Sequence, residues 1–211
     1  DEIVNNHIST FLNKKTQQEL QAFQNGATLP VLTITGSLDG ISKSDKRKCR
    51  VVWNSPDPTR WGTSFTLGTD YTGNSTIQYQ GTSSLQYAIK NYKVKLVDDD
   101  GKKFKYDPFN SGIGESTFTL KADYMESSHC RNTGLAKFIS DCLYSKNSKD
   151  TMNPMQWYNK QNGVMIDVRD TINGFPCRLI MNNVKYATDG SISTIETTDY
   201  NIFNFNLDKG C

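Results

Sequence analysis

Histidine is the scarcest of the chemically versatile residues in this chain of 211 residues, with only His7 and His129. A structural zinc site usually brings its thiolate and imidazole ligands in close pairs. His129 is followed directly by Cys130, and two neighbours on a helix point about 100° apart. The sequence therefore gives little support to a zinc site, or to hydrolysis by a Ser/His/Asp or Cys/His arrangement.

Cysteine is also sparse, and its pattern excludes a disulfide scaffold. The count is odd, the spacings are long, and no C-x-x-C pair occurs. The chain starts with Asp1 and Glu2 rather than with the basic and then apolar order of a signal peptide. We therefore expect free, buried thiols and a location in a virion or in the cytoplasm. The five positions are Cys49, Cys130, Cys142, Cys177 and Cys211.

A strong charge of one sign and a long apolar run are both missing. Lys and Arg number 24 against 22 Asp and Glu, which leaves a net charge of +2. Nucleic-acid binders usually need a clear excess of cations, and a membrane span needs about 20 consecutive apolar residues. We therefore expect neither nucleic acid nor a membrane span among the interactions of this chain. The hydrophobic fraction of 36% nevertheless suffices for a packed core.

The chain divides into a leader and one domain. Residues 1–26 carry a partial helical spacing of apolar residues and end at Asn25-Gly26, which is typical of a helix stop. They predict a helical leader that joins the domain to something upstream, or else an ordinary first helix of the domain. Residues 29–211 form the domain.

Most of the domain has the pattern of β-strands. The turn 98–101 is acidic but does not predict a calcium site, because Lys102 and Lys103 stand where further oxygen ligands would be needed. Residues 54–75 predict a long irregular connection, since Pro, Gly, Thr and Asn are frequent there. The predicted strands are 29–35, 50–53, 77–80, 89–97, 103–106, 117–122, 164–172, 175–181 and 200–207.

Two helices are predicted between the strands. A long amphipathic helix has the apolar face Leu135, Phe138, Ile139, Cys142 and Leu143. A shorter helix is expected from 151–154 to 163. The predicted fold is therefore α+β: a mainly antiparallel sheet with a long amphipathic helix and a C-terminal β-meander, preceded by the helical leader. As the last strand, 200–207 would expose Ile202, Phe203 and Phe205 at a free edge.

Three segments together resemble the CotH family, the spore-coat-associated atypical protein kinases whose domains also occur in phage tail proteins. Similar features are a Gly-Thr-Ser-Ser turn followed by a strand rich in Lys and Tyr, an Arg-Asn pair that opens a helix, and a closing Asn- and Phe-rich strand. The opening Leu29-Pro30-Val31 is also similar. The segments are 81–96, 120–124 with 127–132, and 173–176 with 200–209.

The resemblance implies a nucleotide near the Gly-Thr-Ser-Ser turn and the Arg-Asn pair. Such a turn offers N–H groups and hydroxyls to a phosphate, a lysine adds a positive charge, and the start of a helix favours anions. The plainer alternatives are a strand-exit loop at the turn and local capping at the Arg-Asn pair. The candidate residues are Gly81, Thr82, Ser83, Ser84, Lys90, Arg131 and Asn132. The basic residues Lys43, Lys46, Arg47, Lys48 and Arg50 are more typical of a solvated loop than of a phosphate site.

The resemblance covers only the front portion of the family's domain. In the family, the acidic residues that hold the metal lie largely beyond the closing strand. In this chain Asp208, at the end of that strand, is the one metal candidate. Asp123 and Glu126 are possible partners that match no known catalytic position. We therefore expect that the domain is incomplete at its C-terminus and that other protein subunits or the remainder of a longer chain are its partners.

Three functions compete at this point. The first is a structural or binding module with a CotH-like fold in a larger assembly such as a phage tail or baseplate, without complete catalytic machinery. The alternative is an atypical protein kinase, with ATP and Mg²⁺ or Mn²⁺ as cofactors, of which this chain is the nucleotide-binding half. A third, carbohydrate binding, rests only on aromatic residues that more often anchor a core or a loop: Trp53, Trp61, Trp157 and Tyr158.

Overall fold

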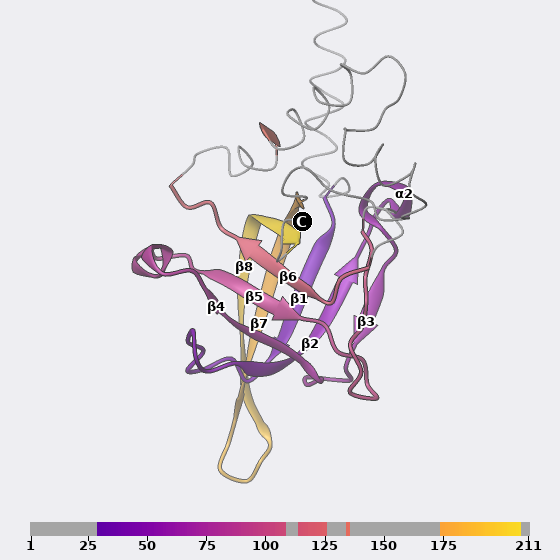
Figure 1. Ribbon diagram of the computed structural model, residues 1–211. Coiled ribbons are helices and arrows are strands. Elements are labelled where there is room, and N and C mark those ends of the chain that lie inside the picture. Colours follow the sequence, from indigo (N-terminus) through magenta and orange to yellow (C-terminus); the bar gives the residue numbers. More distant parts are fainter. Residues whose placement is uncertain (1–28, 109–113, 126–133, 136–173, 208–211) are drawn as a thin grey trace, which may run out of the picture.

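The computed structural model describes residues 29–108, 114–125, 134–135 and 174–207 (Figure 1). Strands account for 53% of this part of the chain. Alternating buried and exposed positions explain the strands: in Arg47–Asn54, for example, Cys49, Val51 and Trp53 are buried. The elements are β1 (Val31–Gly36), β2 (Arg47–Asn54), α2 (Pro58–Trp61), β3 (Phe65–Leu67), β4 (Ser75–Gln80), η1 (Ser83–Gln86), β5 (Asn91–Lys95), β6 (Thr117–Lys121), β7 (Gly174–Tyr186) and β8 (Ile192–Leu207).

Seven of the strands form a closed barrel. Their order is β1-β7-β8-β6-β5-β4-β2, and β2 pairs back onto β1 to close the ring. β1 and β7 are parallel, with Val31 opposite Arg178, whereas the other pairs are antiparallel. The short strand β3 adds to β2 beyond its pairing with β4. Closure removes the free edges that an open sheet would carry along these segments.

Aromatic side chains fill the inside of the barrel. Trp53 is fully buried, and its ring centroid lies 4.9 Å from that of Phe205 and 5.6 Å from that of Phe175. Phe118 stacks on Phe205 at 4.4 Å. The Trp53 indole N–H and the Tyr106 hydroxyl both donate to the carbonyl oxygen of Trp61, at 3.2 and 2.9 Å. The polar ends of these large rings are therefore satisfied inside an apolar core.

The α+β prediction is wrong. The described chain is mostly β, folds as a closed seven-stranded barrel and contains no helix of seven or more residues. Of the apolar face expected for the long amphipathic helix, only Leu135 lies in the described part. The predicted shorter helix, the strand 164–172 and the leader 1–26 lie outside it. Within the described residues, no helix is both long and apolar enough to cross a membrane.

The free edge predicted at 200–207 is wrong for Asn204–Leu207, where β8 has a strand on each side. β8 pairs with β7 on one side and with β6 on the other, with Phe205 opposite both Phe175 and Leu120. Phe203 and Phe205 are therefore buried in the core. A local pattern predicts a strand but cannot show which strands lie beside it, so the last predicted strand was placed at an edge.

Two of the five thiols can be located, and both are free and buried, as predicted. Cys49 lies on β2 and Cys177 on β7. Burial raises the pKa of Cys49 to about 12 and the pKa of Cys177 still further above its usual range. Both thiols therefore stay protonated at neutral pH and act as small apolar side chains.

Replacing Phe118 by Ala should destabilise the barrel by about 3–5 kcal/mol, because a fully buried ring is lost from the centre of the core. Urea denaturation followed by Trp fluorescence measures the change. Lys95→Ala is the matched control, since Lys95 is exposed on the neighbouring strand β5 and should change the unfolding free energy by less than about 0.5 kcal/mol. Equal effects of the two substitutions would contradict this description of the core.

Candidate functional site

The predicted Gly-Thr-Ser-Ser turn follows the end of β4 and leads into the short 3₁₀ helix η1. Gly81 has φ of +100°, a conformation that residues with a side chain rarely adopt. A Cβ atom at this position would lie 2.3 Å from the Ser84 hydroxyl oxygen. The glycine is therefore required by the shape of the turn, and Ser84 folds back over it. The Ser84 hydroxyl is also 3.4 Å from the Gln80 carbonyl oxygen.

Lys90 holds the loop that follows the turn. Its ammonium group donates to the carbonyl oxygen of Leu85 at 2.7 Å and to that of Tyr87. These two carbonyls belong to the end of η1 and the residue after it. Lys90 was predicted to supply its charge to a phosphate, but two of its three N–H donors serve the backbone of its own loop.

A second lysine, in a segment for which the sequence predicts a solvated loop, contacts the turn directly. The Lys43 ammonium group donates to the Thr82 hydroxyl oxygen at 3.1 Å. The segment that carries Lys43 is held against β4, because Gln78 donates to the Lys43 carbonyl oxygen and the Tyr79 amide donates to that of Ser42. Sequence spacing could not reveal this contact, since the two residues are 39 positions apart.

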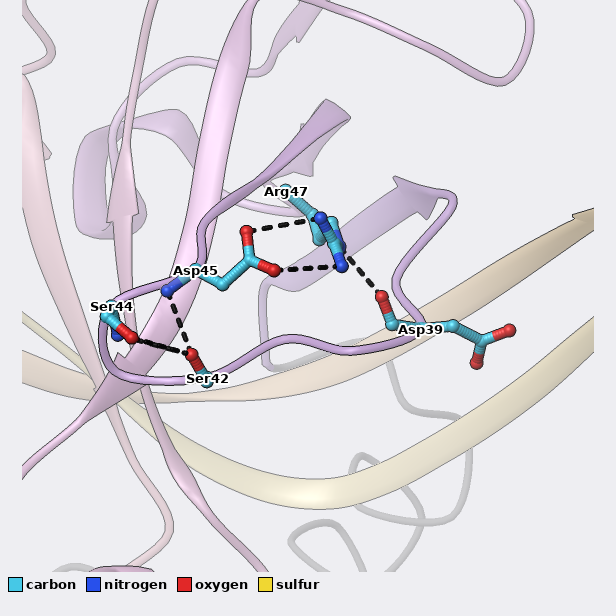
Figure 2. Close-up of polar contacts among 5 residues, drawn as sticks. All are labelled: Asp39, Ser42, Ser44, Asp45 and Arg47. Atoms are coloured by element: carbon cyan, nitrogen blue, oxygen red, sulfur yellow. Dashed lines mark hydrogen bonds and ion pairs between the residues drawn. The ribbon is translucent and has the colours of Figure 1, made fainter.

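The loop that carries Lys43 is ordered by its own polar contacts (Figure 2). The Ser42 hydroxyl accepts the amides of Ser44 and Asp45, and Arg47 forms an ion pair with Asp45 at 3.0 Å. Arg47 also donates from Nε to the Asp39 carbonyl oxygen at 2.7 Å. The guanidinium of Arg47 is therefore used to shape the loop, whereas the Lys43 ammonium extends to the neighbouring turn.

An open pocket of about 240 Å³ lies beside the turn, lined among others by Ser84, Tyr87, Asn91, Asp123 and Tyr124. Tyr87 and Tyr124 stack there with ring centroids 5.4 Å apart. Asp123 has φ of +43°, which is uncommon for a residue other than glycine. Its carboxylate accepts a hydrogen bond from the Asn204 amide at 2.8 Å. A hydroxyl, an amide, a carboxylate and two aromatic rings thus border one shallow surface.

The other predicted site residues cannot be placed. Arg131, Asn132, Asp208 and Glu126 lie outside the described residues. In the part of the chain that the structure describes, no group of three or more His, Cys, Asp and Glu side chains could hold a metal ion. The structure therefore brings together Gly81–Ser84, Lys90, Lys43 and Asp123, but no described metal centre.

The acidic turn 98–101 has a structural role. The Asp98 carboxylate accepts the Lys102 amide at 2.7 Å, and the Asp99 carboxylate accepts the Gly68 amide at 2.9 Å. Gly101 completes the turn with φ of +80°. These two carboxylates accept hydrogen bonds from backbone amides and so hold the turn and its neighbour Gly68 in place.

A second surface feature is a β-hairpin that extends from one end of the barrel (Figure 1). β7 and β8 stay paired from Gly174 and Asn206 to Tyr186 and Ile192, whereas β1 pairs with β7 only as far as Asn183. We call residues 184–200 the arm: 184–195 extend beyond the pairing of β7 with β1, whereas Glu196–Tyr200 lie beside β7 residues that also pair with β1. The sequence predicted strands at 175–181 and 200–207 and a turn at Asp189-Gly190, but gave no sign of the strand over 192–199.

Cross-strand ion pairs neutralise Glu196 and Asp199, the two acidic residues on the β8 side of the arm. Arg178 on β7 binds Asp199 on β8 through two of its guanidinium nitrogens, Nε and Nη2, and Lys185 binds Glu196 at 2.5 Å. The hydrogen bond from Arg178 lowers the pKa of Asp199, and the one to Glu196 raises the pKa of Lys185. Three large apolar side chains remain exposed on the arm: Tyr186, Ile192 and Ile195.

Replacing Lys90 by Met should loosen the loop 81–90, because the carbonyls of Leu85 and Tyr87 lose their donor while the aliphatic stem is kept. We expect a local destabilisation of about 1–3 kcal/mol, measured as faster hydrogen exchange of the amides in this loop. Lys95→Met on β5 is the matched control and should leave their exchange unchanged. Unchanged exchange in the Lys90 variant would contradict the structural role of this lysine.

Comparison of the whole chain with protein-family models gives no match, and comparison with curated proteins gives none either. A functional conclusion therefore has to come from the turn, its two lysines, the adjacent pocket and the arm.

Proposed function

We propose that this chain is a structural or binding module of a larger protein assembly such as a phage tail or baseplate. Its partners are other protein subunits or the remainder of a longer chain, and not nucleic acid. The single observation that carries this proposal is the arm, because it extends beyond the barrel and exposes Tyr186, Ile192 and Ile195. Exposed apolar side chains on a projecting hairpin are typical of a contact with another protein.

The packing of the barrel supports a function carried by its surface. Some β-barrels hold a small ligand in their interior, but here the rings of Trp53, Phe118, Phe175 and Phe205 occupy the centre. Contacts with a partner are therefore to be sought on the loops and on the arm. The three segments that resemble the CotH family give independent support, since such domains also occur in phage tail proteins.

A nucleotide-binding function in an atypical kinase remains the second candidate, and one observation favours it. Lys43 reaches the Thr82 hydroxyl, so a positive charge lies directly at the Gly81–Ser84 turn. The turn borders the pocket that contains Asn91 and Asp123. Against this stands the use of Lys90 by the carbonyls of Leu85 and Tyr87, which leaves a single N–H of that lysine for a phosphate.

Shortening the arm should separate folding from assembly. In this variant residues 186–193 are replaced by Asn-Gly, which closes a tight hairpin between Lys185 and Thr194. These two residues are opposite each other in the register. We expect the barrel to keep its thermal unfolding transition to within about 1 kcal/mol, because the removed residues are exposed.

The same variant should be lost from the complex that co-purifies with the wild-type chain, as measured by quantitative mass spectrometry. Thr188→Lys, an exposed substitution in the turn of the arm that keeps the arm's full length, is the control for a change in charge. Full incorporation of a correctly folded, shortened chain would contradict the proposed function.

Calorimetric titration with ATP and Mg²⁺ or Mn²⁺ tests the second candidate. We expect no detectable heat at millimolar ATP, because Lys90 is engaged by its own loop. Heat that disappears in Lys43→Ala but persists in the control Lys95→Ala would establish nucleotide binding at the turn and replace the module by the kinase interpretation. Circular dichroism of each variant shows that the barrel is intact.

A further inference from the structure

The outer edge of the arm carries backbone groups that are available for another strand. Among the described residues, β8 pairs with β6 only from Asn204 onwards, so between Ile192 and Tyr200 its sole partner is β7. Every residue from 191 to 199 is exposed. The N–H and C=O groups on the side of β8 away from β7 therefore form an edge of the kind to which strands of other chains are added.

This edge lacks the usual protection against pairing. Natural edge strands often carry Lys or Pro, but the segment Thr194–Tyr200 contains no Lys, Arg or Pro. It consists largely of residues with a high β-propensity, namely Thr, Ile and Tyr. A register irregularity lies near the tip, between Lys185 and Tyr186, and leaves the pairing from Thr194 to Tyr200 regular.

The charges of the arm restrict what can pair with it. Glu196 and Asp199 are the two acidic residues of this segment, and each is neutralised across the hairpin, by Lys185 and Arg178. An incoming strand thus finds no unpaired charge to satisfy, and a strongly charged strand would gain nothing here. The outer segment of β8 itself meets this requirement, since it is extended, β-branched and internally neutralised.

We propose that the outer edge of β8 pairs antiparallel with the same edge of a second copy of this chain, around a two-fold axis at Thr197. The proposal rests on the proposed function, because it names the partner of the arm. Two arms would then form one continuous four-stranded sheet, in the order β7-β8 of one copy followed by β8-β7 of the other.

The register between the two β8 strands follows from the charges along Thr194–Tyr200 and from where the regular, unpaired edge begins and ends. In an antiparallel pair, two residues directly opposite each other point to the same side of the sheet. When a two-fold axis relates the two strands, one residue therefore lies directly opposite its own copy, at the axis. An axis at Glu196 would place two carboxylates directly opposite each other, which is destabilising. An axis at Ile195 would bring the irregular tip of the hairpin into the ladder. An axis at Thr198 would place Ile202 opposite Thr194, and Ile202 lies next to the residues of β8 that pair with β6.

An axis at Thr197 avoids these conflicts. It places Thr197 opposite Thr197, a pair that can hydrogen bond across strands, and Glu196 opposite Thr198. Thr194 then faces Tyr200, so the ladder covers the regular segment and ends before β8 joins β6. The Thr197 hydroxyl already donates to the Asn182 side chain at 2.8 Å, which leaves its oxygen as an acceptor for the second copy.

Cysteine cross-linking of the full chain tests both the pairing and its register. Residues directly opposite each other in an antiparallel pair have Cα atoms about 4.5–5.5 Å apart, which suits a disulfide. Thr197→Cys should therefore form a covalent dimer under mild oxidation. Thr194→Cys is the matched control: its two copies would be about 20 Å apart along the ladder and should give no more dimer than the wild-type chain.

Light scattering from low to several hundred micromolar protein gives the second measurement. We expect a concentration-dependent dimer, and we expect Thr197→Lys to raise its dissociation constant by about tenfold or more, because two ammonium groups would face each other. Thr188→Lys, in the turn of the arm, adds the same charge outside the ladder and should leave the dissociation constant unchanged.

Three outcomes would overturn the second-copy proposal: a monomer at every concentration, a dimer that Thr197→Lys does not weaken, or equal cross-linking at positions 194 and 197. A monomer whose Thr197→Lys variant is nevertheless lost from the complex would assign the edge to a strand of a different protein, and the proposed function would stand. The shortened chain keeps Thr194–Tyr200. Its full incorporation, together with a dimer that Thr197→Lys weakens, would overturn the proposed function and leave the self-pairing intact.

Discussion

The pairing of β1 with two strands is the constraint on which the rest of this structure depends. β1 lies between β2, its neighbour in the chain, and β7, which begins more than a hundred residues later. This second pairing closes the sheet into a barrel. Closure brings the inner faces of all seven strands together, and the rings of Trp53, Phe118, Phe175 and Phe205 then fill a single core.

Because aromatic side chains fill the barrel, the polar groups that a ligand could contact lie on the loops. The Gly81–Ser84 turn, the Lys43 loop and the pocket beside Asp123 lie together because β4, β5 and β6 are neighbours in the barrel. In this cluster the lysines have different roles. Lys90 stabilises the backbone of its own loop, whereas Lys43 extends to a hydroxyl of the neighbouring turn. The cluster thus has the hydrogen-bond donors of an anion site, but several of these donors already bind oxygen atoms of the loops themselves.

The arm is the part of β7 and β8 that the closed barrel does not pair on both sides. β7 and β8 are 13 and 16 residues long, far longer than the five or six residues of β5 and β4. In their excess length residues 186–199 are exposed, whereas Val184 at the base of the arm is buried. Cross-strand ion pairs and the pairing with β7 hold this segment extended, and they leave one edge with open hydrogen-bonding groups. Among the described residues, the outer side of β8 between Ile192 and Tyr200 thus carries backbone groups that no strand pairs with.

The sequence by itself determined the local structure of the described chain: the strands near Leu29–Thr35, Arg50–Trp53 and Thr117–Ala122, the turn at Gly81, and the buried, free state of Cys49 and Cys177. Alternation of side chains and glycine conformations are local properties, so they can be inferred from neighbouring residues. Only the tertiary structure decided that Asn204–Leu207 of β8 lie between β6 and β7, that Lys43 contacts Thr82 and that Lys90 binds the carbonyl oxygens of its own loop. These depend on pairings and contacts between segments far apart in the chain, which no local pattern encodes, and closure of the barrel is what selects them.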